Sequence, residues 1–249
     1  QKPLNIRKKQ LYSKVEDGTI GDRGKGDCDG LCESLVTNEI GYVKFYRESD
    51  AKEYDYKPLF QTELGTDNSS NDAITRKLNL ATLMHNGLTI ENLSSYFYWG
   101  LWWPSPNGQS LIDLPGGDSS TYTLLPEYYA FKHFSAYIHS DWRRVETVTT
   151  SNDLMISAYT SADRSQMTVV VVNDSTSAEN LNLNFVDASV ISGSIYLSDA
   201  NTDCALQGSY SSGDEVSIPT KSITTITMNI QPPSVVTTPN ILFIAIDDL

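Results

Sequence analysis

Two short apolar segments of the chain end in side chains that are suited to sugar chemistry. The first, Lys57–Gly65, carries a single carboxylate, Glu63. The second, Ser95–Pro104, carries three indoles, at Trp99, Trp102 and Trp103. Carboxylates act as nucleophile and proton donor when a glycosidic bond is cleaved, and an indole face buries the apolar C–H surface of a sugar ring. These residue types suggest glycosidic-bond hydrolysis, with Glu63 as the candidate nucleophile.

The segments around these residues alternate between strand-like and helix-like patterns. Leu59–Thr62 and Tyr96–Trp102 are short apolar runs typical of buried strands. Asn71–His85 and Pro126–Ile138 carry apolar residues at helical spacing, and Gly87 is a candidate stop for the first of these helices. This order indicates two to three successive βα units. Reactive residues at the carboxyl ends of such strands form the active site of a (β/α)8 barrel, so we expect part of one.

The segment before these units gives weaker signals. Residues 1–30 are polar and rich in glycine, which indicates a loop. From Leu31 to Tyr54 apolar residues recur at helical spacing, and this predicts a helix that would include Glu39. Cys28 and Cys32 are either a small loop disulfide of an exported protein or two unpaired thiols, and their spacing leaves both interpretations open.

The pattern changes at Asp141, where β-branched runs separated by Asn, Asp, Ser and Gly replace the helical periodicity. Several short strands at such spacing predict an antiparallel β-sandwich over residues 141–231. The predicted strands are Arg144–Thr149, Leu154–Tyr159, Met167–Val172, Leu181–Phe185, Val190–Leu197, Glu215–Ile218 and Ile223–Ile230. Residues 232–239 are punctuated by proline and form a candidate linker. The predicted fold class is α/β plus all-β, with residues 1–140 assigned to the barrel.

Composition excludes several classes of partner. The 249 residues include 31 acidic and 18 basic side chains, a net charge of −13. This charge argues against nucleic acid, whose phosphates are neutralised by Lys and Arg. The sequence has no apolar run long enough to span a membrane. A neutral polysaccharide tolerates such an acidic protein.

Several of these segments together resemble the C-terminal half of a glycoside hydrolase family 30 enzyme, from its xylanase-like branch. The segments are Lys57–Glu63, the strand around Tyr96–Trp99, and Glu127–Ser135 running into Arg144 and Val145. The resemblance extends over roughly residues 41–230 and includes the sandwich strands at Ile156–Tyr159 and Val169–Asp174.

The resemblance implies roles for two residues. Glu63 falls at the end of strand seven of the barrel, where the family carries its nucleophile. Trp99 falls on the strand-eight tryptophan that forms the floor of the subsite holding the sugar under attack. The alternative for Trp99 is a place in the barrel core.

The residues next to Trp99 bear on the substrate. Tyr98, Trp102 and Trp103 would extend the aromatic platform, or the two indoles could pack beneath the Pro104–Gly117 loop. Family members directed to glucuronoxylan place arginines just after this strand, where a guanidinium grips the glucuronate carboxylate. This chain has Trp102 and Trp103 there instead, so a neutral xylan or another β-glycan is as suitable a substrate.

The second carboxylate of a retaining glycosidase is missing from the expected place. The family's proton donor follows an asparagine at the end of strand four, and Asn38-Glu39 matches that pair. Three βα units separate strands four and seven, however, and each unit needs about 30 residues. Glu39 lies only 24 positions before Glu63, so it is interpreted as an exposed helix residue. The proton donor is expected upstream of Gln1.

The three histidines carry no catalytic signature. His85 falls in the last turn of the predicted helix, where its charge would suit the helix dipole. His133 and His139 flank an amphipathic helix. No Ser-His-Asp order or metal-ligand spacing emerges, so core or surface positions are expected for all three.

The last ten residues, Asn240–Leu249, resemble the opening strand of a sulfatase of the alkaline-phosphatase-like superfamily. By that resemblance Asp247 and Asp248 would ligate calcium, a cation that prefers carboxylate oxygens. The alternative is an apolar strand with acidic flanks that arose by chance. The nucleophile motif of that superfamily is absent from the chain, and no cofactor is expected for the glycosidase part.

Together these observations predict part of a retaining glycoside hydrolase that acts on a xylan-like polysaccharide and is fused to a sulfatase. The resemblance implies an extracellular or periplasmic location. The alternative is a non-catalytic carbohydrate-binding or structural module built on the sandwich. Because part of a barrel leaves strand edges unpaired, residues 141–230 are expected to fold more stably than residues 1–140.

Overall fold

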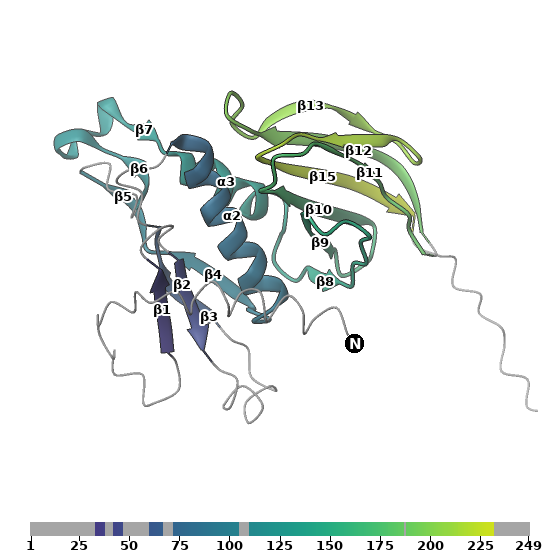
Figure 1. Ribbon diagram of the computed structural model, residues 1–249, viewed down its shortest axis with the longest axis horizontal. Coiled ribbons are helices and arrows are strands. Elements are labelled where there is room, and N and C mark those ends of the chain that lie inside the picture. Colours follow the sequence, from purple (N-terminus) through teal and green to yellow (C-terminus); the bar gives the residue numbers. More distant parts are fainter. Residues whose placement is uncertain are drawn as a thin grey trace, which may run out of the picture.

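The computed structural model describes residues 33–37, 42–46, 60–66, 72–104, 110–186 and 188–231. Two helices, α2 and α3, lie between a group of short strands, β3 to β7, and a large twisted sheet (Figure 1). Within the described residues, no helix is both long and apolar enough to cross a bilayer.

The predicted helix over Leu31–Tyr54 is wrong. This part of the chain instead forms two antiparallel strands, β1 (Glu33–Thr37) and β2 (Tyr42–Tyr46), in which Thr37 pairs with Tyr42. Both strands are short and rich in β-branched or aromatic residues, which favour an extended backbone. Apolar runs this short fit helical and strand periodicity equally well. The helical periodicity was therefore not sufficient evidence for a helix.

The described residues contain one complete strand–helix–strand unit. β3 (Phe60–Leu64) and β4 (Ser95–Tyr98) pair in parallel, and α2 (Ala73–Thr89) connects them. Asp72 caps α2, because its Oδ1 accepts hydrogen bonds from the amides of Ile74 at 3.1 Å and Thr75 at 3.0 Å. Such a side chain satisfies amides that have no partner within the helix. The prediction of a strand–helix–strand unit is confirmed.

The sequence had suggested that Gly87 ends α2, but this prediction is wrong. The helix continues to Thr89, and Ile90 follows as its C-cap. A Cβ atom on residue 87 would lie only 2.7 Å from Leu93 Cδ1. Glycine at this position therefore makes room for the buried Leu93 side chain as the chain folds back toward β4.

The second predicted barrel strand, Tyr96–Trp102, is divided at Trp99. β4 stops at Tyr98, and β5 (Gly100–Trp103) pairs in parallel with β6 (Ser110–Asp113). The predicted loop after Pro104 thus contains a strand. Two short 3₁₀ turns, Pro115–Gly117 and Ser119–Thr121, then lead to β7 (Thr123–Leu124), which pairs antiparallel with β6.

α3 (Pro126–Ser135) begins with proline in its first turn, as predicted. Proline is tolerated there because the amide it lacks would have no partner within the helix. The helix ends three residues before the predicted Ile138. Its first turn carries Glu127, which is fully buried.

A six-stranded antiparallel sheet follows, with the strand order β13-β12-β15-β10-β9-β8. Its strands are β8 (Arg143–Val145), β9 (Leu154–Thr160), β10 (Gln166–Asn173), β12 (Ser189–Ser198), β13 (Ala205–Tyr210) and β15 (Ser222–Gln231). The sequence did not predict β13, because its residues ALQGSY lack a β-branched run.

Two further strands, β11 (Glu179–Asn182) and β14 (Glu215–Ile218), form a second antiparallel layer. Leu181, Val216 and Ile218 of this layer belong to the same apolar cluster as Val169 and Val171 of β10. The two sheets thus pack face to face, as predicted for an antiparallel sandwich.

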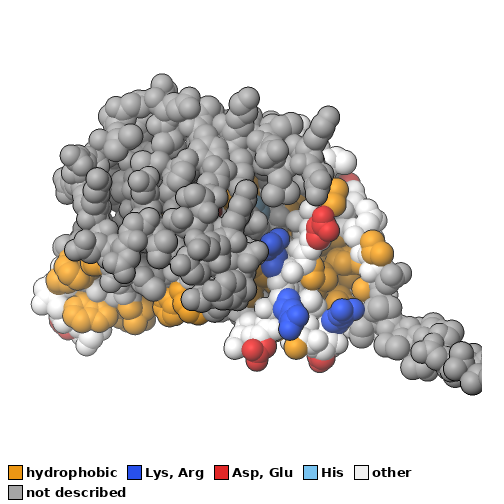
Figure 2. Space-filling model, turned by 90° about the horizontal axis from the view of Figure 1, so that it is seen from below, with side chains coloured by type: hydrophobic (Ala, Val, Ile, Leu, Met, Phe, Trp, Pro, Cys, Tyr) orange, Lys and Arg blue, Asp and Glu red, His pale blue; other side chains and the backbone are white. Residues whose placement is uncertain are grey.

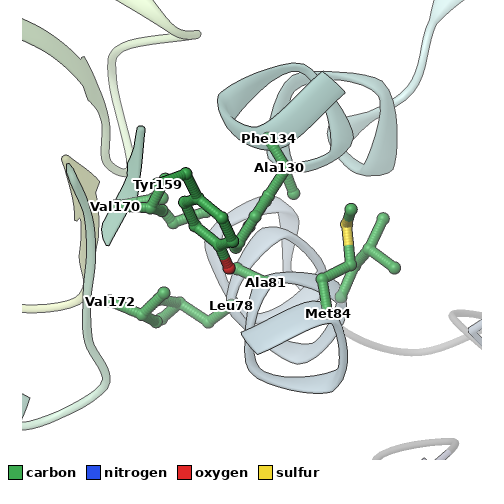
Figure 3. Close-up of a cluster of buried hydrophobic side chains, with 10 residues drawn as sticks. Leu78, Ala81, Met84, Ala130, Phe134, Tyr159, Val170 and Val172 are labelled. Atoms are coloured by element: carbon green, nitrogen blue, oxygen red, sulfur yellow. The ribbon is translucent and has the colours of Figure 1, made fainter. Parts of the chain in front are cut away.

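The opposite face of the large sheet is covered by α2 and α3 (Figure 3). Leu78, Ala81 and Met84 of α2 and Ala130 and Phe134 of α3 are buried there, together with Tyr159, Val170, Val172 and Ile223 of the sheet. Because successive side chains of a strand point to opposite faces, the continuous valine run of β10 supplies both cores. The helices therefore share one core with the large sheet, and the second core lies between the large sheet and the β11–β14 layer.

A buried lysine joins the helices to the sheet as well. Lys77 of α2 is 3% exposed, and its Nζ donates hydrogen bonds to the carbonyl oxygens of Asp199 and Thr202, each at 3.0 Å. The same ammonium group pairs with the carboxylate of Asp203. The turn between β12 and β13 is thus held against α2 by a cation whose donors are all directed at this turn.

Candidate active site

The carboxyl ends of β3 and β4 bring two of the predicted site residues onto neighbouring strands. Leu64 of β3 pairs with Tyr98 of β4. Glu63 precedes the first member of this pair and Trp99 follows the second. The backbone of Glu63 lies in β3, whereas its side chain lies outside the described part of the structure. Its role as nucleophile stays a prediction.

The three indoles are partly exposed. Trp99 is 50% exposed, Trp102 is 53% exposed and Trp103 is 44% exposed. Phe97 and Leu101 on the same stretch are also exposed. In the face shown in Figure 2, apolar side chains gather on the side where Figure 1 places β5, β6 and β7. An exposed aromatic row of this kind is unusual for a soluble protein unless it meets a ligand or another part of the protein.

Tyr98 is turned toward a different neighbour. Its hydroxyl lies 3.3 Å from Thr66 Oγ1 and accepts a hydrogen bond from the Thr66 amide at 3.4 Å. Burial, reinforced by the nearby Glu127 carboxylate, raises the pKa of the Tyr98 hydroxyl well above its usual range. The phenol therefore stays protonated and ties the segment after β3 to β4. The predicted contact of Tyr98 with substrate stays a prediction.

A buried ion pair lies behind these strand ends, and the sequence did not reveal it. Arg76 donates to both carboxylate oxygens of Glu127, from Nε to Oε1 at 2.9 Å and from Nη2 to Oε2 at 2.7 Å. Thr66 Oγ1 adds a long contact of 3.5 Å to Glu127 Oε1. A two-pronged arginine–carboxylate contact fixes orientation as well as distance. This contact fixes the first turns of α2 and α3 relative to Thr66, three residues after Glu63.

Two opposing effects act on the pKa of the Glu127 carboxyl group. Burial raises the pKa of Glu127, and the hydrogen bonds and charge of Arg76 oppose that effect. One signal for the pair was present in the sequence. A cation in the first turn of a helix is unfavourable next to the positive end of the helix dipole, and Arg76 in that position indicates a nearby anionic partner.

His133 is a core residue, in line with the expectation from the sequence. It is fully buried in α3, with Nδ1 2.8 Å from Thr225 Oγ1 and Nε2 2.9 Å from Ser198 Oγ. Thr225 Oγ1 donates its proton to the His133 carbonyl oxygen, so it accepts from Nδ1–H. Nε2 then accepts from the Ser198 hydroxyl. The neutral imidazole with its proton on Nδ1 satisfies every contact.

The environment of His133 keeps this neutral form. Burial, with smaller contributions from the charges of Lys132 and Lys77, lowers the pKa of the imidazole to about 3. The ring therefore joins α3 to β12 and β15 and has no role in proton transfer near neutral pH. His85 is likewise buried in α2, whereas His139 is exposed.

Several predicted residues lie outside the described part of the structure. They are Cys28, Cys32, Glu39, Asp247 and Asp248. Calcium binding by the two aspartates therefore stays a prediction. Among the described residues, no group of three or more His, Cys, Asp or Glu side chains is arranged to hold a metal ion.

Comparison with known proteins gives a match at the level of structure. No model of a protein family matches the sequence, and no curated protein matches it. A family 30 endoxylanase from Clostridium papyrosolvens C71 is similar over 72% of this chain, with a TM-score of 0.58 and 24% identity. A family 30 subfamily 8 xylanase from Clostridium acetobutylicum is similar over 71%, with a TM-score of 0.59 and 25% identity.

The catalytic domain of xylanase C from Talaromyces cellulolyticus, also of family 30, gives a TM-score of 0.60 and 23% identity over 69% of this chain. The chain spans less than half of these structures, namely 44%, 44% and 41% of their lengths. The comparisons show that about 70% of this chain shares its fold with part of these glycoside hydrolases.

Proposed function

We propose that the chain is part of a retaining glycoside hydrolase that cleaves a β-linked, xylan-like polysaccharide, with Glu63 as the nucleophile. The observation that supports this most is the parallel pairing of β3 and β4. It places Leu64 opposite Tyr98, so that Glu63 and Trp99 both lie near the carboxyl ends of neighbouring strands. The indole of Trp99 is half exposed. The similarity in fold to glycoside hydrolases supports the same proposal.

The proposed reaction has two steps. The Glu63 carboxylate attacks the anomeric carbon, the bond to the leaving oxygen breaks, and a second carboxylic acid protonates that oxygen. Water then attacks the resulting glycosyl ester, giving up a proton to the second carboxylate, and Glu63 leaves as the free carboxylate. The second group must lie about 5–5.5 Å from Glu63. It is expected on a barrel strand contributed by the rest of the enzyme.

Several described residues would help to hold Glu63 in position. The Arg76–Glu127 pair and the Thr66–Tyr98 contact hold the segment after β3 against β4. Such support matters because a displacement of about 1 Å at a reacting group costs on the order of a hundredfold in rate. The indoles of Trp99, Trp102 and Trp103 provide apolar faces for sugar rings. With aromatic groups where guanidinium groups would bind glucuronate, the proposed substrate of the glycosidase is a xylan-like chain recognised without glucuronate.

Replacement of Glu63 tests the catalytic part of the proposal. In the full-length protein, Glu63→Ala should lower the hydrolysis of xylan by several orders of magnitude, because no glycosyl-enzyme can form. Azide should restore turnover and yield a glycosyl azide of inverted anomeric configuration, since it takes the place of the missing carboxylate. The exposed Glu146 offers a matched control, and Glu146→Ala should change nothing. Unchanged hydrolysis by Glu63→Ala would refute the assignment.

The second part of the proposal is a sulfatase domain after the sandwich, in which Asp247 and Asp248 would bind calcium. It rests on the resemblance of Asn240–Leu249 to the opening strand of a sulfatase. A sulfatase on the same chain would suit a sulfated polysaccharide. The test is sulfate release from sulfated xylan by the full-length protein, with and without a calcium chelator. Absence of sulfate release would remove this part and leave the glycosidase proposal intact.

The alternative is a non-catalytic carbohydrate-binding or structural module. It would be favoured if the full-length protein bound xylan without producing reducing ends. The shared core of the helices and the large sheet supports a bracing role for the sandwich, which is compatible with either function.

A further inference from the structure

A hollow on the large sheet lies apart from the elements that carry Glu63 and the indoles. Its volume is about 350 Å³, at the lower end of the range for small-molecule sites. The floor comes from β10, β12 and β15, and one wall comes from the segment that follows α3. Neither β3 nor β4 nor β5 contributes to it.

The floor is made of polar side chains in register across three strands. Thr168 pairs with Thr227, which in turn pairs with Ser194. Two residues further along, Gln166 pairs with Asn229, which pairs with Ser192. Because side chains two residues apart share a face of a sheet, the two polar rows lie side by side.

This floor continues the face that α2 and α3 cover. Val170 and Val172 of β10 are buried against the helices, and the next residues on the same face of the strand are Thr168 and Gln166. The face thus changes from apolar to polar where the helical cover ends. Asn229 and Gln166 are exposed, and the Asn229 side-chain nitrogen donates to Ser192 Oγ at 3.0 Å, which orients the Asn229 amide within the row.

The wall of the hollow is aromatic and anchored to the floor. Tyr137, His139 and Trp142 line it. Thr168 Oγ1 donates a hydrogen bond to the Tyr137 carbonyl oxygen at 2.7 Å. The rings of His139 and Trp142 pack edge to face, with 5.3 Å between their centroids. Trp142 also packs against the core shared with the helices. The wall is therefore held in place without a ligand.

The chemistry of the lining selects among ligands. The described residues that line the hollow include hydroxyl, amide, thioether and aromatic groups, and none is Asp, Glu, Lys or Arg. This lining offers an ionic ligand no carboxylate, ammonium or guanidinium group. Hydroxyl and amide groups beside an aromatic wall suit a sugar ring, which offers hydroxyls at its edge and C–H groups on its faces.

We propose that this hollow, formed by the Gln166–Asn229–Ser192 row and the Tyr137–Trp142 wall, is a second, non-catalytic binding site for a neutral polysaccharide chain. The nature of the ligand rests on the proposed function, because a glycan substrate supplies the chain that would reach both sites. The site would hold the polymer on the sandwich while another stretch of it enters the barrel.

Affinity electrophoresis of the 249-residue chain in gels containing unsubstituted β-1,4-xylan tests the proposal. To remove binding at the barrel, Trp99, Trp102 and Trp103 are first replaced together by alanine. This triple variant should still be retarded by xylan. Adding Gln166→Ala and Asn229→Ala should weaken the retardation about tenfold in dissociation constant, the size expected for losing two hydrogen bonds. Asn152→Ala, an exposed asparagine elsewhere, is the matched control.

The outcomes test the second binding site separately from the catalytic role of Glu63. If the triple variant is not retarded, or if the Gln166 and Asn229 replacements leave its retardation unchanged, the second site is refuted. Hydrolysis by the full-length protein and its loss in Glu63→Ala would still support the glycosidase. If retardation depends on Gln166 and Asn229 while Glu63→Ala hydrolyses xylan normally, the second site stands and the catalytic assignment fails. Circular dichroism of each variant confirms that it is folded.

Discussion

At the scale of single residues, two fully buried polar side chains hold in place the helices behind the strand ends. Glu127 is fully buried and is held by both nitrogens of a two-pronged Arg76 contact. His133 is fully buried as a neutral ring with one donated and one accepted hydrogen bond. Neither residue is suited to turnover chemistry. Both fix the helices on which the strand ends depend.

Breaking the Arg76–Glu127 pair should destabilise the protein strongly. Arg76→Met leaves a buried carboxylate without its partner, and we expect a loss of about 3–5 kcal/mol in the free energy of unfolding. The double variant Arg76→Met, Glu127→Leu should recover most of that loss, because no charge remains buried. Urea unfolding of the 249-residue chain measures both. Arg143→Met, at an exposed position, is the control, and a loss below 1 kcal/mol in Arg76→Met would contradict the prediction.

The lowered pKa of His133 should make stability depend on pH. The unfolded state binds a proton at a pKa near 6.5, whereas the folded imidazole binds it only near 3. The unfolded state therefore holds more protons between these values. The contribution is fully present above pH 6.5 and declines as the pH falls toward 3, by at most about 1.4 kcal/mol per pH unit.

Urea unfolding at pH 7, 6, 5 and 4 measures this dependence. His133→Gln should flatten the curve by the equivalent of one proton, whatever its effect on stability at pH 7. Gln207→Ala, which replaces a non-titrating side chain at an exposed position, is the control and should leave the slope as it is. An identical slope in wild type and His133→Gln would show that His133 titrates normally.

At the scale of elements, the junction between α2 and the large sheet depends on one cation. Lys77 Nζ contacts two carbonyl oxygens of the turn between β12 and β13 and the Asp203 carboxylate. Lys77→Met keeps the length of the side chain and removes the donors, so we expect a loss of about 2 kcal/mol and faster hydrogen exchange in residues 199–204. Lys132→Met on α3 is the control, and exchange that stays unchanged at that turn would argue against this role.

The elements also show what periodicity can and cannot decide. α2, α3 and most sandwich strands were predictable because each combines a clear period with a cap or a turn. The chain from Leu31 to Tyr54 was misassigned because short apolar runs fit both periods. β6 and β13 were missed because cross-strand pairing stabilises them more than their own composition does.

At the scale of the whole molecule, the helices and the sandwich share a core. Val170, Val172 and Ile223 of the sheet are buried against Leu78 and Phe134 of the helices. The sequence had suggested that residues 141–230 are the stable unit. The structure indicates that this unit also needs α2 and α3, because without them the apolar face of the sheet would be open to water.

The stabilities of two fragments, one with α2 and α3 and one without them, test whether the sandwich needs these helices. Residues 72–231 should unfold cooperatively and without binding of a dye for exposed apolar surface. Residues 141–231 should bind that dye and have a midpoint lower by 10 °C or more, since several buried side chains lose their cover and each kcal/mol lost shifts the midpoint by about 4–8 °C in a domain of this size. Equal stability of the two fragments would show that the sandwich is independent.

The sequence alone determined the strand–helix–strand unit around α2, the change from βα units to a sandwich, and the aromatic and carboxylate residues at the ends of two strands. These features are local, because periodicity, caps and turn residues act over a few positions. Only the tertiary structure decided which residues support them. The Arg76–Glu127 pair spans 51 positions, the His133–Thr225 contact spans 92 and the Lys77–Thr202 contact spans 125. Such pairings arise when separate elements pack together, and a local pattern can at most indicate that one residue needs a partner without identifying that partner.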